Sequence, residues 1–249
     1  VRGGGLDALK DANIALKRAK KNRRGGHVVF SNEMGFDIRE RVRLLRGLRA
    51  AVDNECLFIV YQPQVSLDNG QVVGTEALLR WRDGDGGFVP PEKFIPLAET
   101  SGLIVVLGDW VLRTACHELR RLQALGWSEL RMSVNVSLIQ FRHPGFLDKL
   151  RTALQDTGIA PAKLELEITE SVAMEDADFI LETLTAIKAL GVSIAIDDFG
   201  TGYSSLSQLR QLPVDRLKID RVFVRELNGQ IQGGHIAAMV VELGRSLGM

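Results

Sequence analysis

The sequence predicts an α/β fold in which mostly parallel strands alternate with amphipathic helices. Its 249 residues are 45% hydrophobic and 25% charged, which is typical of a globular chain with one large core. Apolar runs of strand length are separated by longer segments with apolar residues at helical spacing. A turn signal, Asp68-Asn69-Gly70, separates the first two of these runs.

The predicted elements follow one another in a regular order. The Asp-Asn-Gly turn makes the first two strands antiparallel. The later strands alternate with helices, which implies parallel strands joined by right-handed crossovers, in either an open doubly wound sheet or a closed barrel. We predict strands near 57–67, 72–82, 131–137, 163–170, 193–198 and 216–224, and helices near 91–100, 103–125, 145–157, 176–190, 203–211 and 233–247.

The number of strands bears on the choice between sheet and barrel. Closing a (β/α) barrel takes eight strands, and the sequence contains about six. The helix near 233–247 leads toward a strand that does not follow by Met249. We therefore expect a fold that is truncated after about six strands, without the last two strands of a barrel.

The beginning of the chain is organised differently. Apolar residues at helical spacing predict one helix over 6–21 and another over 38–54, which begins the main domain. Between them, residues 27–30 (HVVF) predict a short strand that needs a sheet to join. We therefore divide the chain into a preceding segment, 1–36, and a main domain, 37–249.

Charge and cysteine content exclude several classes of protein. The basic run 17–24 could contact nucleic acid or a membrane, but we interpret it as the solvated end of a helix, because cations are stabilised near a helix C-terminus. Cys56 and Cys116 form no CxxC pair, which argues against structural zinc and a disulfide-stabilised secreted domain. No run of about 18 apolar residues is present. We expect a cytoplasmic segment without membrane or nucleic-acid contact, although the full-length protein could be anchored at the inner membrane.

Two neighbouring predicted strands contain acidic residues. Parallel α/β folds gather their catalytic groups at the C-terminal ends of such strands. Glu165 and Glu167 alternate with apolar residues in one strand, and the next strand ends in Asp197 and Asp198. Adjacent carboxylates repel each other, so their burial is costly unless a cation compensates. A divalent metal ion is the simplest compensation. The alternative is an aspartate that caps the following helix.

Three further strands carry polar groups toward the same rim. Lys218 and Asp220 lie on one face of their predicted strand, where a structural ion pair between them is the ordinary alternative. The ordinary alternative for Asn135 is a hydrogen bond to the local backbone. Glu76 needs a partner within an apolar strand, and Arg80 is on the same face.

Five consecutive predicted strands thus direct a carboxylate, an amide or an ammonium toward one rim. Oxygen ligands without histidine or cysteine favour Mg²⁺ or Mn²⁺ over Zn²⁺. Two such ions about 3.5–4 Å apart are the usual device for phosphodiester cleavage. The residues therefore indicate a hard-metal site.

Seven segments occur together in an order that is typical of one family. They are YQPQ at 61–64, EALLRW at 76–81, PEKFIPLAETSGLI at 91–104, NVS at 135–137, ELEITES at 165–171, DDFGTGYSSL at 197–206 and LKIDRVFV at 217–224. Together they resemble the EAL domain family of bacterial cyclic di-GMP phosphodiesterases, from about residue 40 onward. The resemblance implies a TIM-like (β/α) barrel with an antiparallel first strand.

The resemblance also implies a two-metal site that uses Mg²⁺ or Mn²⁺. Its first ion is bound by Glu76, Asn135, Glu167 and Asp197. Asp197 bridges to a second ion, which Asp198 also binds.

The same resemblance implies catalytic roles for Lys218, Glu76 and Asp220. Lys218 positions and activates the attacking water, with Asp220 in support. Hydrolysis converts cyclic di-GMP to linear pGpG.

Gln62 and Arg80 are implied to hold the dinucleotide, Arg80 through a phosphate. Glu170 is implied to steady the loop 199–206, which links the metal site to formation of a homodimer.

Two parts of the chain relate to the family differently. Residues 6–34 resemble the closing helix and strand of a GGDEF diguanylate cyclase domain. At the other end, the family continues with a strand whose glutamate completes the second metal site and a later strand with a substrate-contacting glutamine, and neither lies within 1–249. We therefore expect little or no activity from residues 1–249 alone.

The resemblance leaves other functions to be weighed. A catalytically inactive cyclic di-GMP receptor is one alternative, although the metal ligands that such receptors usually lose are retained in the matching segments. An unrelated metal-dependent barrel enzyme is another, but it does not account for the motifs together.

Overall fold

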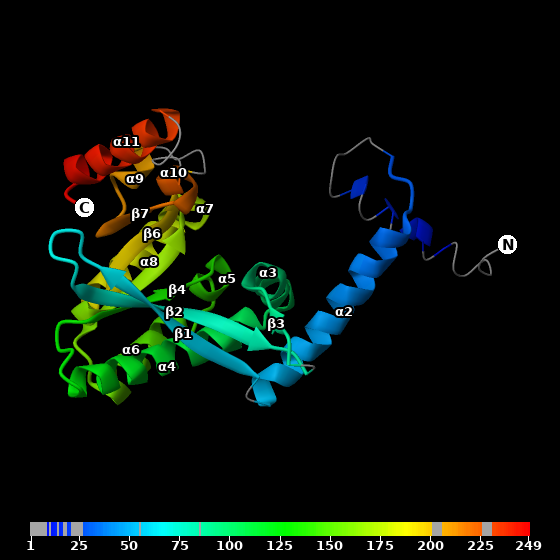
Figure 1. Cartoon of the computed structure of the whole chain (residues 1–249), viewed down its shortest axis with the longest axis horizontal. Coiled ribbons are helices and arrows are strands. Elements are labelled where there is room, and N and C mark those ends of the chain that lie inside the picture. The colour runs from blue at the N-terminus through cyan, green and yellow to red at the C-terminus, as the bar shows by residue number, and fades with distance from the viewer. Residues whose placement is uncertain are drawn as a thin grey trace.

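One mixed β-sheet forms the centre of the molecule (Figure 1). The computed structural model describes residues 27–54, 56–84, 86–200, 206–225 and 231–249, together with scattered positions between 9 and 20. Neighbouring strands follow the order β1-β2-β4-β5-β6-β7, and β3 pairs with β2. The strands are β1 Leu57–Val65, β2 Val72–Arg82, β3 Phe88–Val89, β4 Arg131–Asn135, β5 Leu164–Thr169, β6 Ser193–Phe199 and β7 Arg216–Ile219.

The first two strands form the predicted antiparallel hairpin, in which Gln62 lies opposite Glu76. The backbone N–H of Ser66 donates to the carbonyl of Gln71 at 2.8 Å and closes the turn. Gly70 has a φ of +69°, a left-handed conformation that glycine adopts at the least cost. This requirement explains why the Asp-Asn-Gly signal predicted the hairpin correctly.

From β2 onward, the pairs that build the main sheet are parallel: β2 with β4, β4 with β5, β5 with β6, and β6 with β7. The prediction of parallel strands joined through helices is therefore confirmed. α4 and α6 lie side by side along the strands (Figure 1). The helices after β2 are α3 Pro91–Ser101, α4 Ile104–Ala124, α5 Leu138–Phe141, α6 Phe146–Thr157, the 3-10 turn η1 Pro161–Lys163, α7 Glu170–Ala173, α8 Ala177–Ala189, α9 Leu206–Leu209, α10 Arg221–Arg225 and α11 Ile231–Leu247.

The two faces of the sheet differ in polarity. Leu164, Leu166 and Ile168 of β5 are almost completely buried and belong to the main apolar core, with residues of α4, α6 and α8. Glu165 and Glu167 point to the opposite face because side chains alternate along a strand. The helices thus cover an apolar face, while the other face carries the polar groups.

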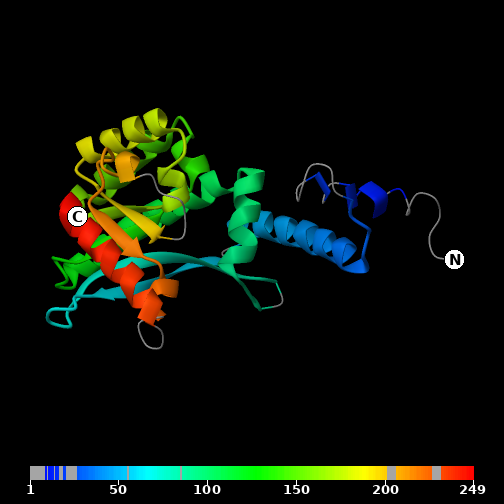
Figure 2. The same cartoon turned by 90° about the horizontal axis from the view of Figure 1, so that it is seen from above.

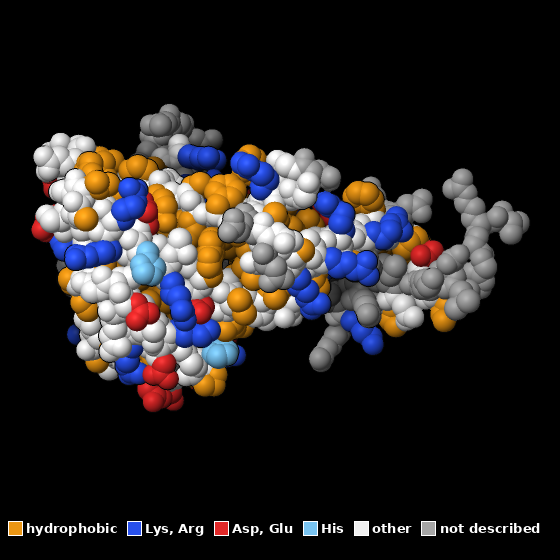
Figure 3. Space-filling view, turned by 90° about the horizontal axis from the view of Figure 1, so that it is seen from below, with side chains coloured by type: hydrophobic (Ala, Val, Ile, Leu, Met, Phe, Trp, Pro, Cys, Tyr) orange, Lys and Arg blue, Asp and Glu red, His pale blue; other side chains and the backbone are white. Residues whose placement is uncertain are grey.

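The long helix α2 (Asn32–Asp53) connects to the domain through its C-terminal half. Leu44 and Leu48 are buried there in a second apolar cluster with Trp81 and Phe94. The N-terminal half of α2 extends away from the sheet (Figures 1 and 2). Figure 3 shows lysine and arginine side chains along this narrow part of the molecule. The exposed arginines of α2 are Arg39, Arg41, Arg43, Arg46 and Arg49.

The first part of the chain contains some of the predicted elements and lacks one of them. The strand predicted at 27–30 is wrong, because these residues adopt no regular structure and pair with no strand among the described residues. The helix predicted at 38–54 is present but begins earlier, at Asn32. Half of the helix predicted at 6–21 lies outside the described residues, and the described positions in it are helical.

The strand predicted at 216–224 is too long. β7 ends at Ile219, and α10 begins at Arg221. The carboxylate of Asp220 accepts a hydrogen bond from the N–H of Val222 at 2.7 Å, which favours a helical turn over a continued strand. Part of the helix predicted at 203–211 is α9, while residues 201–205 lie outside the described residues.

Within the described part of the chain, no single helix is both long and apolar enough for a membrane span. Only α3 and α4 meet that criterion as a pair, and they are bent by 118° at the break between them.

The buried face of β5 gives a test of this architecture. Leu166→Ala removes a side chain that is 0% exposed, and we expect it to lower the free energy of unfolding by about 2–5 kcal/mol. Leu67→Ala, in the exposed hairpin turn, is the matched control and should change it by less than about 0.5 kcal/mol. Urea unfolding of both variants measures the difference. Equal stability of the two variants would contradict the burial of this face.

Candidate active site

Polar side chains from five strands meet on one side of the sheet. They are Glu76 of β2, Asn135 of β4, Glu167 of β5, Asp197 of β6 and Lys218 of β7. Asn135 is the last residue of β4, Asp197 is the third from the end of β6, and Lys218 is the penultimate residue of β7. The structure therefore brings these predicted residues together at the rim expected for a parallel α/β fold.

Lys218 lies at the centre of this group. Its Nζ is 2.5 Å from Glu167 Oε2, 2.8 Å from Asp197 Oδ2 and 3.2 Å from Glu76 Oε2. Carboxylate oxygens of the same three acids lie within 4.8 Å of one another. The structural alternative, in which Lys218 pairs with Asp220, is not the arrangement that these distances describe.

Asn135 joins the group through Glu76. The Asn135 side-chain amide donates from Nδ2 to Glu76 Oε1 at 2.7 Å. The other oxygen of Glu76 accepts from Lys218. Glu76 therefore has a partner on each oxygen, and Arg80 is not that partner, because its Nη1 donates to the carbonyl of Leu79 at 2.9 Å.

Glu167 is the most deeply buried acid of the group, with 1% of its surface exposed. Its Oε1 is buried and has no hydrogen-bond partner among the described residues. A buried carboxylate oxygen without a partner is costly, and a metal ion is one way to satisfy it. Together with the oxygen-only donor set, this atom fits a hard divalent cation.

Burial and neighbouring charges shift the ionisation of the group. Burial raises the pKa of Glu167 to about 7, and the negative charges of Glu76 and Asp197 act in the same direction, while Lys218 opposes them. Burial alone would lower the pKa of Lys218, but Glu167 and Asp197 outweigh it and hold that pKa above its ordinary value. Lys218 is therefore a permanent cation within a surplus of acids.

Asp198 lies next to this group under a different constraint. Its φ is +55°, an uncommon conformation for a residue with a side chain. Its N–H donates to Asp197 Oδ1 at 2.9 Å. Burial, then the charges of Asp197 and Asp220, raise the pKa of Asp198. The two aspartates and Asp220 thus form an acidic edge beside Lys218.

The predicted substrate-binding residues lie on β1 and β2. Gln62 is exposed and lies opposite Glu76, while Arg80 is half-buried four residues further along β2. Even-numbered residues of β2 share a face, so Arg80 and Glu76 are on the same side of the sheet.

Glu170 links α7 to the end of β6. Its side chain is 3% exposed, and Oε2 accepts from the N–H of Gly200 at 2.8 Å. Gly200 has a φ of +100° and lies close to the Phe223 ring. Most of the loop 199–206 is outside the described residues, so the role of Glu170 in that loop stays a prediction.

Sequence reasoning named Glu165 but missed the second polar group that it forms, deeper on the same face. Glu165 is 1% exposed and accepts from Ser133 Oγ and from Arg216 Nε, each at 2.9 Å. Arg216 precedes Lys218 by two residues, as Glu165 precedes Glu167. This matched spacing was the available signal, because residues two apart share a face of a strand.

A parallel sheet that presents carboxylates, an amide and a lysine at its C-terminal rim defines an α/β protein with a candidate hard-metal site. A model of the EAL domain family matches residues 45–249. The chain therefore belongs to the EAL domain family.

Curated relatives agree with this assignment. The bifunctional diguanylate cyclase/cyclic di-GMP phosphodiesterase MucR of Pseudomonas aeruginosa is 44% identical over 98% of this chain and 36% of its own length. The cyclic di-GMP phosphodiesterase NbdA of the same species is 39% identical over 97% of this chain and 31% of its length. The chain thus spans about a third of the length of these relatives.

Solved structures confirm the barrel fold. The MucR phosphodiesterase in complex with cyclic di-GMP has a TM-score of 0.80 and 46% identity, covering 83% of this chain and 84% of that one. The FimX EAL domain of Pseudomonas aeruginosa bound to cyclic di-GMP has a TM-score of 0.72 and 26% identity, covering 82% of each chain. The predicted TIM-like fold with an antiparallel first strand is therefore correct.

The raised pKa of Glu167 gives a pH test in the presence of a chelator. Between its ordinary pKa of 4.5 and about 7, the folded protein holds a proton that the unfolded chain has released. Stability should therefore fall as pH rises through this window, and Glu167→Gln should reduce the fall by up to about 2–3 kcal/mol. Urea unfolding at pH 5, 6 and 7 measures it.

Glu129→Gln is the control for this test. Glu129 is exposed, and its contact with Lys163 lowers its pKa, so its titration lies below the window. The control should keep the pH dependence of the wild type. An unchanged pH dependence in Glu167→Gln would contradict the assigned shift.

Proposed function

We propose that this chain supplies the catalytic domain of a metal-dependent phosphodiesterase that hydrolyses cyclic di-GMP to linear pGpG. The observation that carries the proposal is the group formed by Glu76, Glu167, Asp197 and Lys218, in which three acids surround one ammonium. The substrate is inferred from relatives named as cyclic di-GMP phosphodiesterases.

The acids of this group are suited to hold Mg²⁺ or Mn²⁺. Glu76, Asn135, Glu167 and Asp197 would hold a first ion, and Asp197 and Asp198 a second. The unpartnered Oε1 of Glu167 supports this placement. When bound, such ions supply positive charge that stabilises the charge developing on the phosphodiester oxygens.

Lys218 acts in this proposal as a donor that orients the attacking water. Because its pKa is raised, Nζ stays protonated and donates hydrogen bonds without accepting a proton. The neighbouring carboxylates are the available proton acceptors. The water oxygen gives one proton to a carboxylate and forms a bond to phosphorus, the bond to the 3′ oxygen breaks, and that oxygen takes up a proton from solvent and leaves as the 3′ hydroxyl.

Asp220 supports Lys218 through the backbone. Its carboxylate accepts from the N–H of Val222 and so fixes the turn between β7 and α10, directly after Lys218. Its negative charge also raises the pKa of Asp198. Asp220 therefore follows Lys218 in the chain and also acts on Asp198 of β6.

Gln62 and Arg80 are proposed to bind the dinucleotide beside this group. Arg80 shares a face of β2 with Glu76, and a guanidinium matches the geometry of a phosphate. Gln62 is opposite Glu76 in the hairpin register. Both residues are therefore within the same part of the sheet as the acids.

Further proposals concern the surroundings of the domain. Residues 6–34 are proposed to end a preceding GGDEF-like domain, with a boundary near residue 36. The similarity to the bifunctional MucR over 98% of this chain supports this. We also propose a homodimer formed through the face of loop 199–206, and a cytoplasmic location.

The competing function is a receptor that binds cyclic di-GMP without cleaving it. One assay separates the two: the full-length protein is incubated with cyclic di-GMP and Mg²⁺ or Mn²⁺, and pGpG is measured by chromatography. We expect pGpG from the wild type and none with excess chelator. Tight binding without product, even with Mn²⁺, would establish the receptor and refute the enzyme.

Substitutions at the acidic group test the residue assignments. Glu76→Ala, Asp197→Ala and Lys218→Ala should each lower kcat by at least about 100-fold, because each removes a charge at the reacting phosphate. Glu182→Ala, on α8, is a control that should retain the wild-type rate. Circular dichroism checks folding. A near-normal rate in any of the three would remove that residue from the mechanism.

A pair of arginines on β2 tests substrate binding. Arg80→Ala should raise KM for cyclic di-GMP about tenfold with a smaller change in kcat, because a phosphate contact is lost. Arg82 is the matched control, since its guanidinium lies 5.6 and 5.2 Å from the centres of the Phe58 and Phe88 rings. Arg82→Ala should leave KM within about twofold. Equal KM values in the two variants would contradict the role of Arg80.

A further inference from the structure

The chain turns out of the sheet shortly after Asn135, whose amide contacts Glu76. Asn135 is the last residue of β4, and the N–H of Val136 still donates to the carbonyl of Glu167 at 2.8 Å. After Val136 the chain leaves the sheet, and Ser137 is the N-cap of α5. The sheet therefore holds Asn135 up to Val136, and the turn on its far side begins at Ser137.

The Gln140 side chain is hydrogen-bonded to the backbone of Ser137. Gln140 Oε1 accepts from the N–H of Ser137 at 3.1 Å, and Ser137 Oγ accepts from the N–H of Gln140 at 3.4 Å. This reciprocal pair is a capping box, here on a helix of four residues. Gln140 is 7% exposed, which is unusual for glutamine. A short helix that makes few bonds of its own is thus anchored by one buried side chain.

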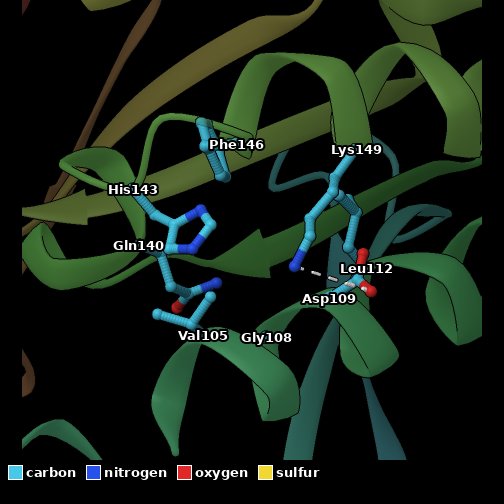
Figure 4. Close-up of a pocket in the computed structure, with 8 residues that line it drawn as sticks. All are labelled: Val105, Gly108, Asp109, Leu112, Gln140, His143, Phe146 and Lys149. Atoms are coloured by element: carbon cyan, nitrogen blue, oxygen red, sulfur yellow. Dashed lines mark ion pairs between the residues drawn. The ribbon is translucent and has the colours of Figure 1, made fainter. Parts of the chain in front are cut away.

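α4 provides the space in which Gln140 lies. A Cβ at Gly108 would be 1.8 Å from Gln140 Nε2 and 2.3 Å from Cδ, so only glycine permits this approach. Glycine inside a helix costs about 1 kcal/mol relative to alanine, which a packing requirement can offset. Figure 4 shows the Gln140 side chain directed toward α4 beside Gly108 and Val105.

We propose that Gln140, seated against Gly108, is a positioning residue for Asn135 at the metal site. Gln140 fixes the N–H of Ser137, the resulting turn directs the Asn135 amide, and the amide meets Glu76 at 2.7 Å. The inference rests on the metal site of the proposed function and adds a residue that touches neither metal nor nucleotide.

The test uses Mn²⁺ binding, measured by the electron paramagnetic resonance signal of free Mn²⁺ in titrations of the full-length protein. Gln140→Met fills a similar volume without the amide oxygen, whereas Gln140→Glu retains an acceptor for the Ser137 N–H. We expect Gln140→Met to weaken Mn²⁺ binding about tenfold and Gln140→Glu to stay within about threefold of wild type. Gly108→Ala, which keeps the glutamine but displaces it, should act like Gln140→Met.

A double-variant series shows whether the effect passes through Asn135. In an Asn135→Ala background, Gln140→Met and Gln140→Glu should bind Mn²⁺ within about twofold of each other. An equal loss in both backgrounds would overturn the proposal. Unaltered Mn²⁺ binding in Gln140→Met and Gly108→Ala, with only lower melting temperatures, would show an ordinary helix cap and also overturn it.

The same titration separates this proposal from the proposed function. If the wild type binds Mn²⁺ and the Gln140 variants bind it equally well, the positioning role alone fails. If the wild type binds no Mn²⁺, the metal site fails and the positioning role fails with it.

Discussion

The ammonium of Lys218 and the carboxylates of Glu76, Glu167 and Asp197 meet at distances of 2.5–3.2 Å, and each of the four residues comes from a different strand. The three carboxylates repel one another and are attracted to the ammonium. These forces constrain the sheet, because three acids are tolerated together only where a cation faces them. A slip of one residue in any strand would turn its side chain to the helix-covered face. The site therefore depends on correct register across most of the domain.

The deeper polar group repeats the same link between β5 and β7. Glu165 and Arg216 meet at 2.9 Å two residues before Glu167 and Lys218. Between these strands, β6 contributes Ala195, which lies opposite both Glu167 and Arg216 and is completely buried. Its small side chain leaves room for β5 and β7 to interact across β6. The strand register and the active-site geometry are thus stabilised by two neighbouring polar pairs on one face of the sheet.

Sequence reasoning succeeded where the signals are local. The Asp-Asn-Gly turn, the apolar alternation of β5 and the strand ends at Asp197 and Lys218 predicted the hairpin, the parallel sheet and the acidic rim. It failed where the secondary structure depends on a neighbouring strand or on a side chain that starts a helical turn. Residues 27–30 have a strand-like pattern but no neighbouring strand among the described residues, and Asp220 ends β7 by bonding to Val222.

The same limit applies within the site. The capping-box pattern of Ser137 and Gln140 is visible in the sequence, but its seat against Gly108 depends on how α4 packs. The pairing of Lys218 with three acids also required the strands to be placed, since spacing alone suggested Asp220 as its partner. Composition and periodicity therefore indicate a metal site, whereas packing decides which groups build it.

We propose that the acids around Lys218 hold the metal required for cleavage of cyclic di-GMP. The most direct measurement titrates Mn²⁺ into metal-free full-length protein and follows bound Mn²⁺ and the rate of pGpG formation in the same samples. The rate should rise in step with bound Mn²⁺, and both should be lost in Glu167→Gln. Cleavage at the full rate without bound metal, or Mn²⁺ binding and cleavage unaffected by Glu167→Gln, would contradict this proposal.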